Sequence, residues 1–193
     1  MNRNKFIEES LIESADTKKL ILEKCSADIN KAADVIKECF TNGGKLLLCG
    51  NGGSAADCQH IATEFVIRLS HDIKRPGLPA IALTTDTSNL TAGGNDIGFE
   101  NVFARSLEAF GNKGDVLLGI STSGNSQNVL NAFAKAKEKA MVTLAFLGGN
   151  GGKLKSVSDH SIIIPSSNVQ RIQEGHITVA HIVCEIVERE LFS

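Results

Sequence analysis

The sequence contains neither tryptophan nor tyrosine, and its aromatic content is limited to nine phenylalanines. The side chains that most often stack on nucleic-acid bases are therefore missing. The formal net charge is −2, so the chain carries no overall basic field of the kind that attracts a phosphate backbone. Both absences argue against nucleic acid as a partner.

Long apolar runs and paired cysteines are also absent. No run reaches the roughly 18 apolar residues of a membrane span, so we expect no membrane association. The first residues, MNRNKFIEESLIESADTKK, are polar and charged and lack the apolar core of a secretion signal. The five cysteines are dispersed without a CxxC pair, which is typical of free thiols in a reducing compartment. We therefore expect a cytoplasmic protein.

The length and the hydrophobic pattern indicate one α/β domain with a helical arm. A chain of 193 residues with 42% hydrophobic residues can bury a sizeable core. Helical spacing at about 3–24 and 27–41 predicts two leading helices, the second ending at the Asn-Gly-Gly of 42–44. We assign residues 1–42 to an arm that packs on the sheet domain or on another subunit, and residues 43–193 to the sheet domain.

Short apolar segments alternate with helical patterns through the sheet domain. This alternation is typical of a doubly wound parallel sheet flanked by helices. The expected strands are 45–50, 79–85, 115–122, 141–148 and 160–166, and the expected helices are 54–70, 99–110, 126–140, 152–157 and 169–191.

The stretch GNGGS (50–54) lies between an expected strand and an expected helix. Its glycines allow backbone N–H groups to approach an anion, and a helix N-terminus adds positive potential. No lysine follows the glycines as in a P-loop, and the spacing is not GxGxxG. The alternative is a tight turn without a ligand.

The stretch STSGNS (121–126) repeats this arrangement after another strand. Hydroxyls of Ser121, Thr122, Ser123 and Ser126, together with helix-terminal N–H groups, suit a phosphate. N-capping of the next helix is the alternative, but one cap needs only one hydroxyl. In an open parallel sheet both loops lie at the carboxyl ends of strands, where ligands bind.

A third polar stretch, TAGGNDIGFE (91–100), also follows an expected strand. Asn95 and Asp96 offer hydrogen bonds to a polyol. A turn with an Asx cap explains the same residues without a ligand.

Two polar pairs lie at helical spacing among apolar residues. His60 and Glu64 are four residues apart, and Gln173 and His181 are eight apart, so each pair shares one helix face. Nitrogen and oxygen donors of this kind suit zinc. They suit a general acid and a general base equally well. A lone histidine on an apolar helix is often a hydrogen-bonded core residue, and only the joint arrangement argues against that explanation.

Five motifs in order, GNGGSAAD, QHxxxEF, NDxGFE, STSGNS and RIQEGH, resemble the sugar isomerase (SIS) family over nearly the whole chain. The sequence is most similar to its phosphoheptose isomerases, which convert D-sedoheptulose 7-phosphate to D-glycero-D-manno-heptose 7-phosphate. The resemblance implies the SIS fold, a homotetramer with sites at subunit interfaces, and a first step of heptose synthesis for lipopolysaccharide or capsule.

The resemblance also implies roles for individual residues. Glu64 would be the base and His181 the acid. The zinc site would consist of His60, Glu64, Gln173 and His181. The substrate would be bound by Asn51, Gly52, Gly53, Ser54, Glu64, Asn95, Asp96, Ser121, Thr122, Ser123, Ser126 and Gln173.

Other SIS proteins provide the rival functions. One relative is a non-catalytic tetramer that binds a replication initiator protein, and others sense sugar phosphates or isomerise a different sugar phosphate. The presence of both Glu64 and His181 favours an enzyme, and the motif RIQEGH favours a heptose substrate.

Overall fold

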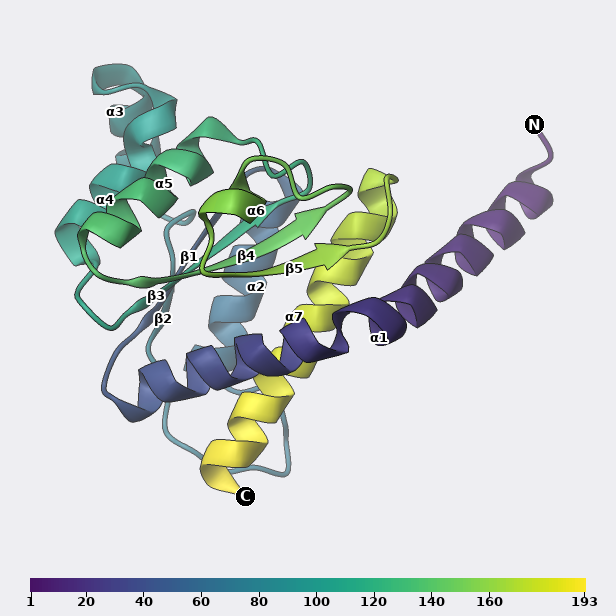
Figure 1. Cartoon of the computed structure of the whole chain (residues 1–193), viewed down its shortest axis with the longest axis horizontal. Coiled ribbons are helices and arrows are strands. Elements are labelled where there is room, and N and C mark those ends of the chain that lie inside the picture. Colours follow the sequence, from purple (N-terminus) through teal and green to yellow (C-terminus); the bar gives the residue numbers. More distant parts are fainter.

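The computed structural model describes all 193 residues and contains a five-stranded parallel sheet with helices on both faces (Figure 1). The strand order is β2-β1-β3-β4-β5. The chain leaves β1 for β2 on one side and then crosses back to β3 on the other, so the winding direction reverses between β1 and β3. The strands are β1 (Leu46–Gly50), β2 (Ala80–Ala82), β3 (Val116–Ser121), β4 (Val142–Gly148) and β5 (His160–Ile164). The predicted doubly wound α/β fold is confirmed.

Helices cover both faces of the sheet, which explains why its strands read as continuous apolar runs. Every residue of β1 and of β3 is buried. One face packs against α1, α2 and α7, and the other against α4, α5 and α6. The helices are α1 (Arg3–Thr41), α2 (Gly53–Val66), α3 (Thr87–Asp96), α4 (Val102–Phe110), α5 (Gln127–Glu138), α6 (Leu154–Val157) and α7 (Val169–Phe192), with a 3₁₀ turn η1 (Phe99–Asn101) before α4.

The leading segment is one helix, and the prediction of two helices was wrong. α1 runs unbroken for 39 residues. No glycine or proline interrupts it at the expected break, and Cys25 and Ile29 are both buried there. The apolar stripe therefore continues across that point and keeps the helix on α7 and β5. The first turns extend past the sheet domain, and residues 3–9 are all exposed (Figure 1).

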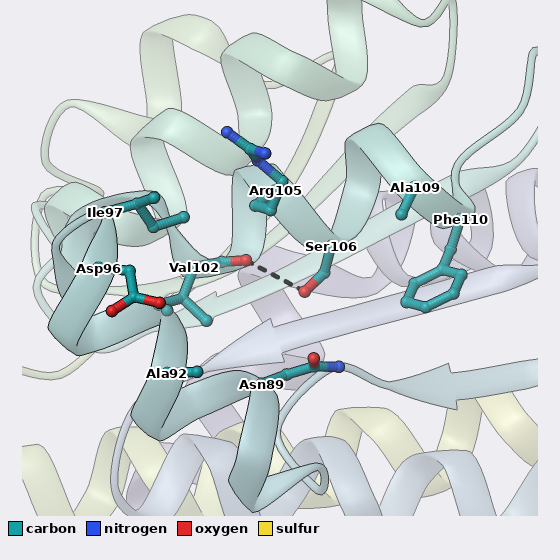
Figure 2. Close-up of a pocket in the computed structure, with 10 residues that line it drawn as sticks. Asn89, Ala92, Asp96, Ile97, Val102, Arg105, Ser106, Ala109 and Phe110 are labelled. Carbon is teal, nitrogen blue, oxygen red and sulfur yellow. Dashed lines mark hydrogen bonds between the residues drawn. The ribbon is translucent and has the colours of Figure 1, made fainter.

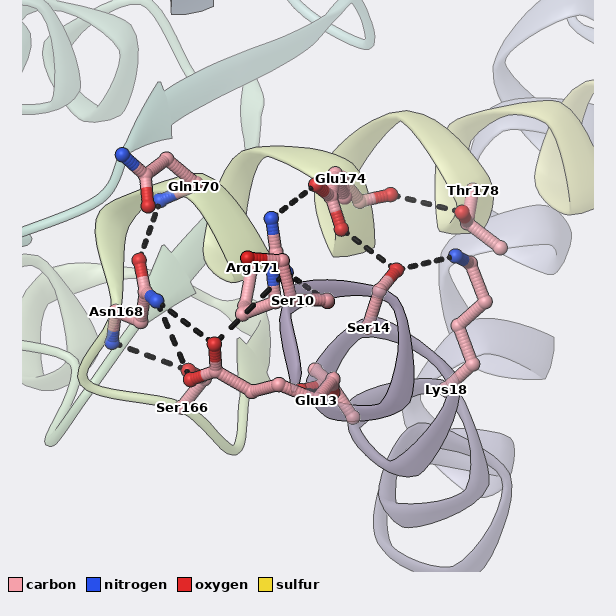
Figure 3. A network of polar contacts seen from close by, with 11 residues as sticks. Ser10, Glu13, Ser14, Lys18, Ser166, Asn168, Gln170, Arg171, Glu174 and Thr178 are labelled. Carbon is pink, nitrogen blue, oxygen red and sulfur yellow. Dashed lines mark hydrogen bonds and ion pairs between the residues drawn. The ribbon is translucent and has the colours of Figure 1, made fainter. Parts of the chain in front are cut away.

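A polar network joins the N-terminal half of α1 to the start of α7 (Figure 3). Arg171 donates to the backbone carbonyl of Ser10 and, at 2.7 Å, to Glu174. The hydroxyl of Ser14 donates to the other oxygen of Glu174 at 2.7 Å. The arm is thus fixed by polar contacts at the helix turns that flank Gln173.

The segment after β2 also differs from the prediction. Residues 91–96 belong to α3, which begins at Thr87 after the N-cap Asp86, whose side chain accepts a hydrogen bond from the Asn89 backbone at 3.0 Å. An Asx-type cap therefore starts a helix instead of a turn. None of the residues of α3 is buried.

No helix of the structure combines the length and apolarity needed to cross a membrane. The cytoplasmic location stays a prediction.

Candidate functional site

The two polar loops lie side by side at the point where the winding of the sheet reverses. Gly50, the last residue of β1, pairs in register with Ile120 of β3, so the loops that follow leave the sheet together. The side chains of Asn51 and Asn128 exchange two hydrogen bonds, of 2.9 and 2.8 Å, across the gap between them. Ligands of open α/β sheets bind in this crevice.

The first loop presents the N-terminus of α2 to the crevice. Gly52 precedes the helix with φ of +56°, a conformation that favours glycine, and no side chain caps the helix. The N–H groups of Ser54 and Ala55 bond back to Asn51 and Gly52. Ser54 itself is buried, while Gly52 and Gly53 are exposed.

The second loop turns its hydroxyls toward one another instead of capping α5. The hydroxyls of Ser121 and Ser126 lie 3.1 Å apart, and Ser126 makes no capping hydrogen bond. Capping therefore does not explain this serine. Gly124 has φ of +64°, and a side chain there would meet the Gly151 carbonyl at 2.0 Å, so the loop is held against the β4–α6 connection. Thr122 is half-buried and Ser123 is exposed.

The structure brings His60, Glu64 and His181 together from two helices. Their candidate ligand atoms all lie within 4.8 Å of one another. Nε2 of His60 is 2.9 Å from Oε1 of Glu64 and 3.2 Å from Nε2 of His181. The two ring nitrogens form a hydrogen bond only if one of them carries a proton. The cluster lies at the surface of the single chain, since the His60 side chain is 46% exposed.

The spacing of this cluster fits a zinc ion. Four ligands placed tetrahedrally at about 2.05 Å from zinc are about 3.3 Å from one another. The His60–His181 distance of 3.2 Å and the His60–Glu64 distance of 2.9 Å are close to that value. Two imidazole nitrogens and a carboxylate oxygen are also donors that zinc prefers.

Gln173 joins the helix of His181 to the first loop. It lies eight residues before His181 on α7, and a side chain at Gly53 would meet its amide nitrogen at 2.6 Å. A side chain at position 53 would have to displace this amide. Gln173 is therefore placed against the loop, where it can reach a ligand in the crevice.

Asn95 and Asp96 are the predicted residues that the chain does not bring to the crevice. Both are exposed at the end of α3, and the Asn95 amide donates to Asp96 at 2.7 Å. α3 packs on η1 and α4. Asp96 lines a hollow of about 250 Å³ between α3 and α4, together with Arg105 and Phe110 (Figure 2). This hollow is separate from the two loops.

Sequence reasoning missed Asn128, Arg75 and Glu188. Asn128 is a buried amide that is hydrogen-bonded to Asn51. Its position two residues after STSGNS could have pointed to it. Arg75 and Glu188 form an ion pair of 2.8 Å whose side chains are each 1% exposed. Burial acts to raise the pKa of Glu188, but hydrogen bonds from Ser70 and Arg75 outweigh it and lower that pKa below its usual value. The seven-residue spacing from His181 was the signal for Glu188, whereas nothing in the sequence singled out Arg75.

Comparison with known proteins identifies the family. A model of the SIS domain matches residues 11–148. Phosphoheptose isomerase of Pelodictyon phaeoclathratiforme is 53% identical over 95% of this chain and 87% of its own length. The Clostridium acetobutylicum phosphoheptose isomerase is 51% identical over 97% of this chain and 95% of its own length.

Solved structures agree. A phosphoheptose isomerase from Francisella tularensis superimposes with a TM-score of 0.94 at 37% identity, over 98% of this chain and 100% of that one. The phosphoheptose isomerase of Neisseria gonorrhoeae gives a TM-score of 0.90 at 40% identity, over 96% of this chain and 98% of that one. With its paired crevice loops and its histidine–glutamate cluster, the chain belongs to the phosphoheptose isomerases of the SIS domain family.

Proposed function

We propose that this enzyme interconverts D-sedoheptulose 7-phosphate and D-glycero-D-manno-heptose 7-phosphate, the first step of heptose synthesis for lipopolysaccharide or capsule. The chain is an isomerase of sugar phosphates, as its relatives are. The observation that supports the assignment is the convergence of Glu64, His60 and His181 beside two loops suited to a phosphorylated ligand.

The isomerisation moves a proton between two adjacent carbons through an enediol. Glu64 takes a proton from C1 of the ketose and returns it to C2, while His181 moves a proton between the two oxygens. Oε1 of Glu64 faces His60, whereas its other oxygen has no hydrogen-bond partner in the chain. That second oxygen is the one free to accept the proton.

The substrate phosphate is held away from the reacting carbons by the hydroxyls of residues 121–126. The N-termini of α5 and α2 both point their positive ends into the crevice. Asn51, Gly52, Gly53 and Gln173 contact the sugar chain. Binding energy gained at the phosphate fixes the reacting end relative to Glu64.

A zinc ion would be held by His60, Glu64, Gln173 and His181. When bound, it would supply Lewis-acid polarisation of the carbonyl oxygen. The three donors that lie within 4.8 Å support this proposal. Glu64 would then transfer the proton through the oxygen that does not face His60, and His181 could act as the acid only while its Nε2 does not hold the metal.

The enzyme works as a homotetramer with its sites at subunit interfaces. Two features support this proposal. Phe6, Ile7 and Leu11 on α1 are 55%, 55% and 67% exposed, and α3 has no buried residue. A neighbouring copy that covers these surfaces would also provide the route by which Asn95 and Asp96 contact sugar in another subunit's crevice.

The test is direct observation of the reaction. Purified protein is mixed with sedoheptulose 7-phosphate and followed by NMR, with chelator, with added zinc, and with fructose 6-phosphate as a control substrate. New aldoheptose signals, absent with the control sugar, support the proposal. Loss of those signals with chelator and their return with zinc support the metal site. Folded protein that turns over no sugar under any metal condition would favour the non-catalytic tetramer that binds another protein.

A further inference from the structure

Arg75 occupies the C-terminal end of α2, directly behind the turn that carries Glu64. Its guanidinium donates through Nη2 to the backbone carbonyl of Glu64 and through Nη1 to that of Phe65, both at 2.7 Å. The Arg75 side chain is 1% exposed. The arginine therefore reaches inward from the loop between α2 and β2 and contacts the catalytic turn through its backbone.

These carbonyls need an external partner because the helix stops there. α2 ends at Val66, so the carbonyls of its last turn lack the N–H donors that a further helical turn would supply. The backbone N–H of the capping residue, Ile67, donates to the carbonyl of Thr63 and to no later carbonyl of the helix. A buried cation at this end also compensates the negative end of the helix dipole. The Phe65 carbonyl also accepts a hydrogen bond from the backbone N–H of Leu78 at 3.0 Å, so Arg75 and Leu78 together complete the end of α2.

Glu188 anchors this arginine to α7. Nε of Arg75 donates to Oε1 of Glu188 at 2.8 Å, and the backbone N–H of Ser70 donates to Oε2 at 2.9 Å. The Leu69 N–H approaches Oε1 at 3.4 Å. Every side-chain hydrogen bond of Glu188 therefore goes to Arg75 or to the backbone of the loop that follows α2.

The pair joins the same two helices that meet in the histidine–glutamate cluster. Glu188 lies seven residues after His181, about two helical turns along the same face of α7. The helices are therefore tied at two levels, by His60 with His181 and by Arg75 with Glu188. We propose that Arg75 and Glu188 are positioning residues that set the rotation of the Glu64 turn against the His181 turn. The catalytic meaning of this position rests on the proposed function.

Arg75→Lys tests the proposal because it keeps the charge but loses the planar fork that binds two carbonyls and a carboxylate at once. We expect kcat and zinc affinity each to fall by about 10-fold to 100-fold. The KM for sedoheptulose 7-phosphate should change by less than about twofold, since the phosphate loops are untouched. Glu188→Gln, which keeps the shape of the side chain, should act in the same direction.

The measurements are kcat and KM, zinc affinity by competition with a fluorescent chelator, and ¹⁵N NMR of the His60 and His181 rings. Circular dichroism establishes that each variant is folded. The matched control is Arg189→Gln, next to Glu188, which removes exposed ion pairs with Glu185 and with Asp72 of the same loop. Because exposed ion pairs contribute little, it should leave all readouts as in the wild type.

Folded Arg75→Lys with wild-type kcat and unmoved ring signals would overturn the proposal. If both variants fail to fold, the pair is structural and the positioning role is wrong. If the wild type isomerises no sugar, the proposed function fails, and the ring signals alone decide the positioning: shifts of His60 and His181 support it and unchanged signals refute it.

Discussion

Acid should destabilise this protein through one buried histidine, His176 on α7. The residue is 1% exposed, and its Nε2 lies 2.9 Å from the carbonyl oxygen of Leu147. Nδ1 is buried without a hydrogen-bond partner. Burial lowers the pKa of His176 to about 4, although the hydrogen bond to Leu147 opposes the shift. The folded protein therefore keeps a neutral ring that donates from Nε2.

The size of the effect follows from the difference between the folded and unfolded pKa values. An unfolded histidine has a pKa of about 6.5, so the unfolded chain binds the proton first. The stabilising contribution is complete above pH 6.5 and is lost as the pH falls through the folded pKa of about 4. This difference corresponds to about 3 kcal/mol in full, of which about 2 kcal/mol is lost by pH 5.

Urea unfolding at pH 7.5 and pH 5, at one protein concentration, measures this loss. His176→Gln keeps an N–H for the Leu147 carbonyl but does not titrate. We expect the wild type to lose about 2 kcal/mol more than this variant between the two pH values. His71→Gln, at an exposed position, should retain the wild-type pH dependence. Equal losses in the wild type and His176→Gln would refute the reasoning.

Three further substitutions probe the site and the core. Glu64→Gln should lower kcat by about 10²-fold to 10⁴-fold while the Kd for the sugar phosphate, measured by calorimetry, is retained; full turnover would refute the role of this residue as base. Ser123→Ala should raise KM about fivefold in steady-state kinetics with kcat nearly constant, and an unchanged KM would move the phosphate elsewhere. Gly119→Ala places a Cβ 2.3 Å from the Phe133 ring, and should cost about 1–3 kcal/mol in urea unfolding, whereas Gly94→Ala, with open space around it, should cost nothing.

The sheet was predictable because its strands carry their own signal. Segments such as 45–50 and 115–122 are short and continuously apolar, which a strand covered on both faces requires. The glycine-bearing loops were predictable for a different reason: Gly52 and Gly124 adopt positive φ, a backbone conformation that favours glycine over other residues. Helix periodicity placed His60 with Glu64 on one helix face, and the family resemblance implied that His181 of another helix joins them, as the structure shows.

Contacts between segments were harder to predict. The absence of glycine and proline near residue 25 allows a continuous α1 but does not require one, because the continuity also depends on how α7 packs against the helix. Asn95 and Asp96 were expected in a polar stretch outside the predicted helices, yet they end a helix that Asp86 caps and that packs on η1 and α4. Arg75 is one arginine in a polar loop until the fold places Glu188 and the end of α2 around it.

The unbroken α1 also gives the protein a reporter of its own assembly. Residues 3–9 have no buried member, so in an isolated chain only helix propensity protects their backbone amides from solvent exchange. From Thr17 onward buried residues recur along the helix, and the amides there exchange only when the domain opens. The ratio of deuterium uptake in these two parts of one helix thus measures how completely a second molecule covers the first turns, without a label and without a change of sequence.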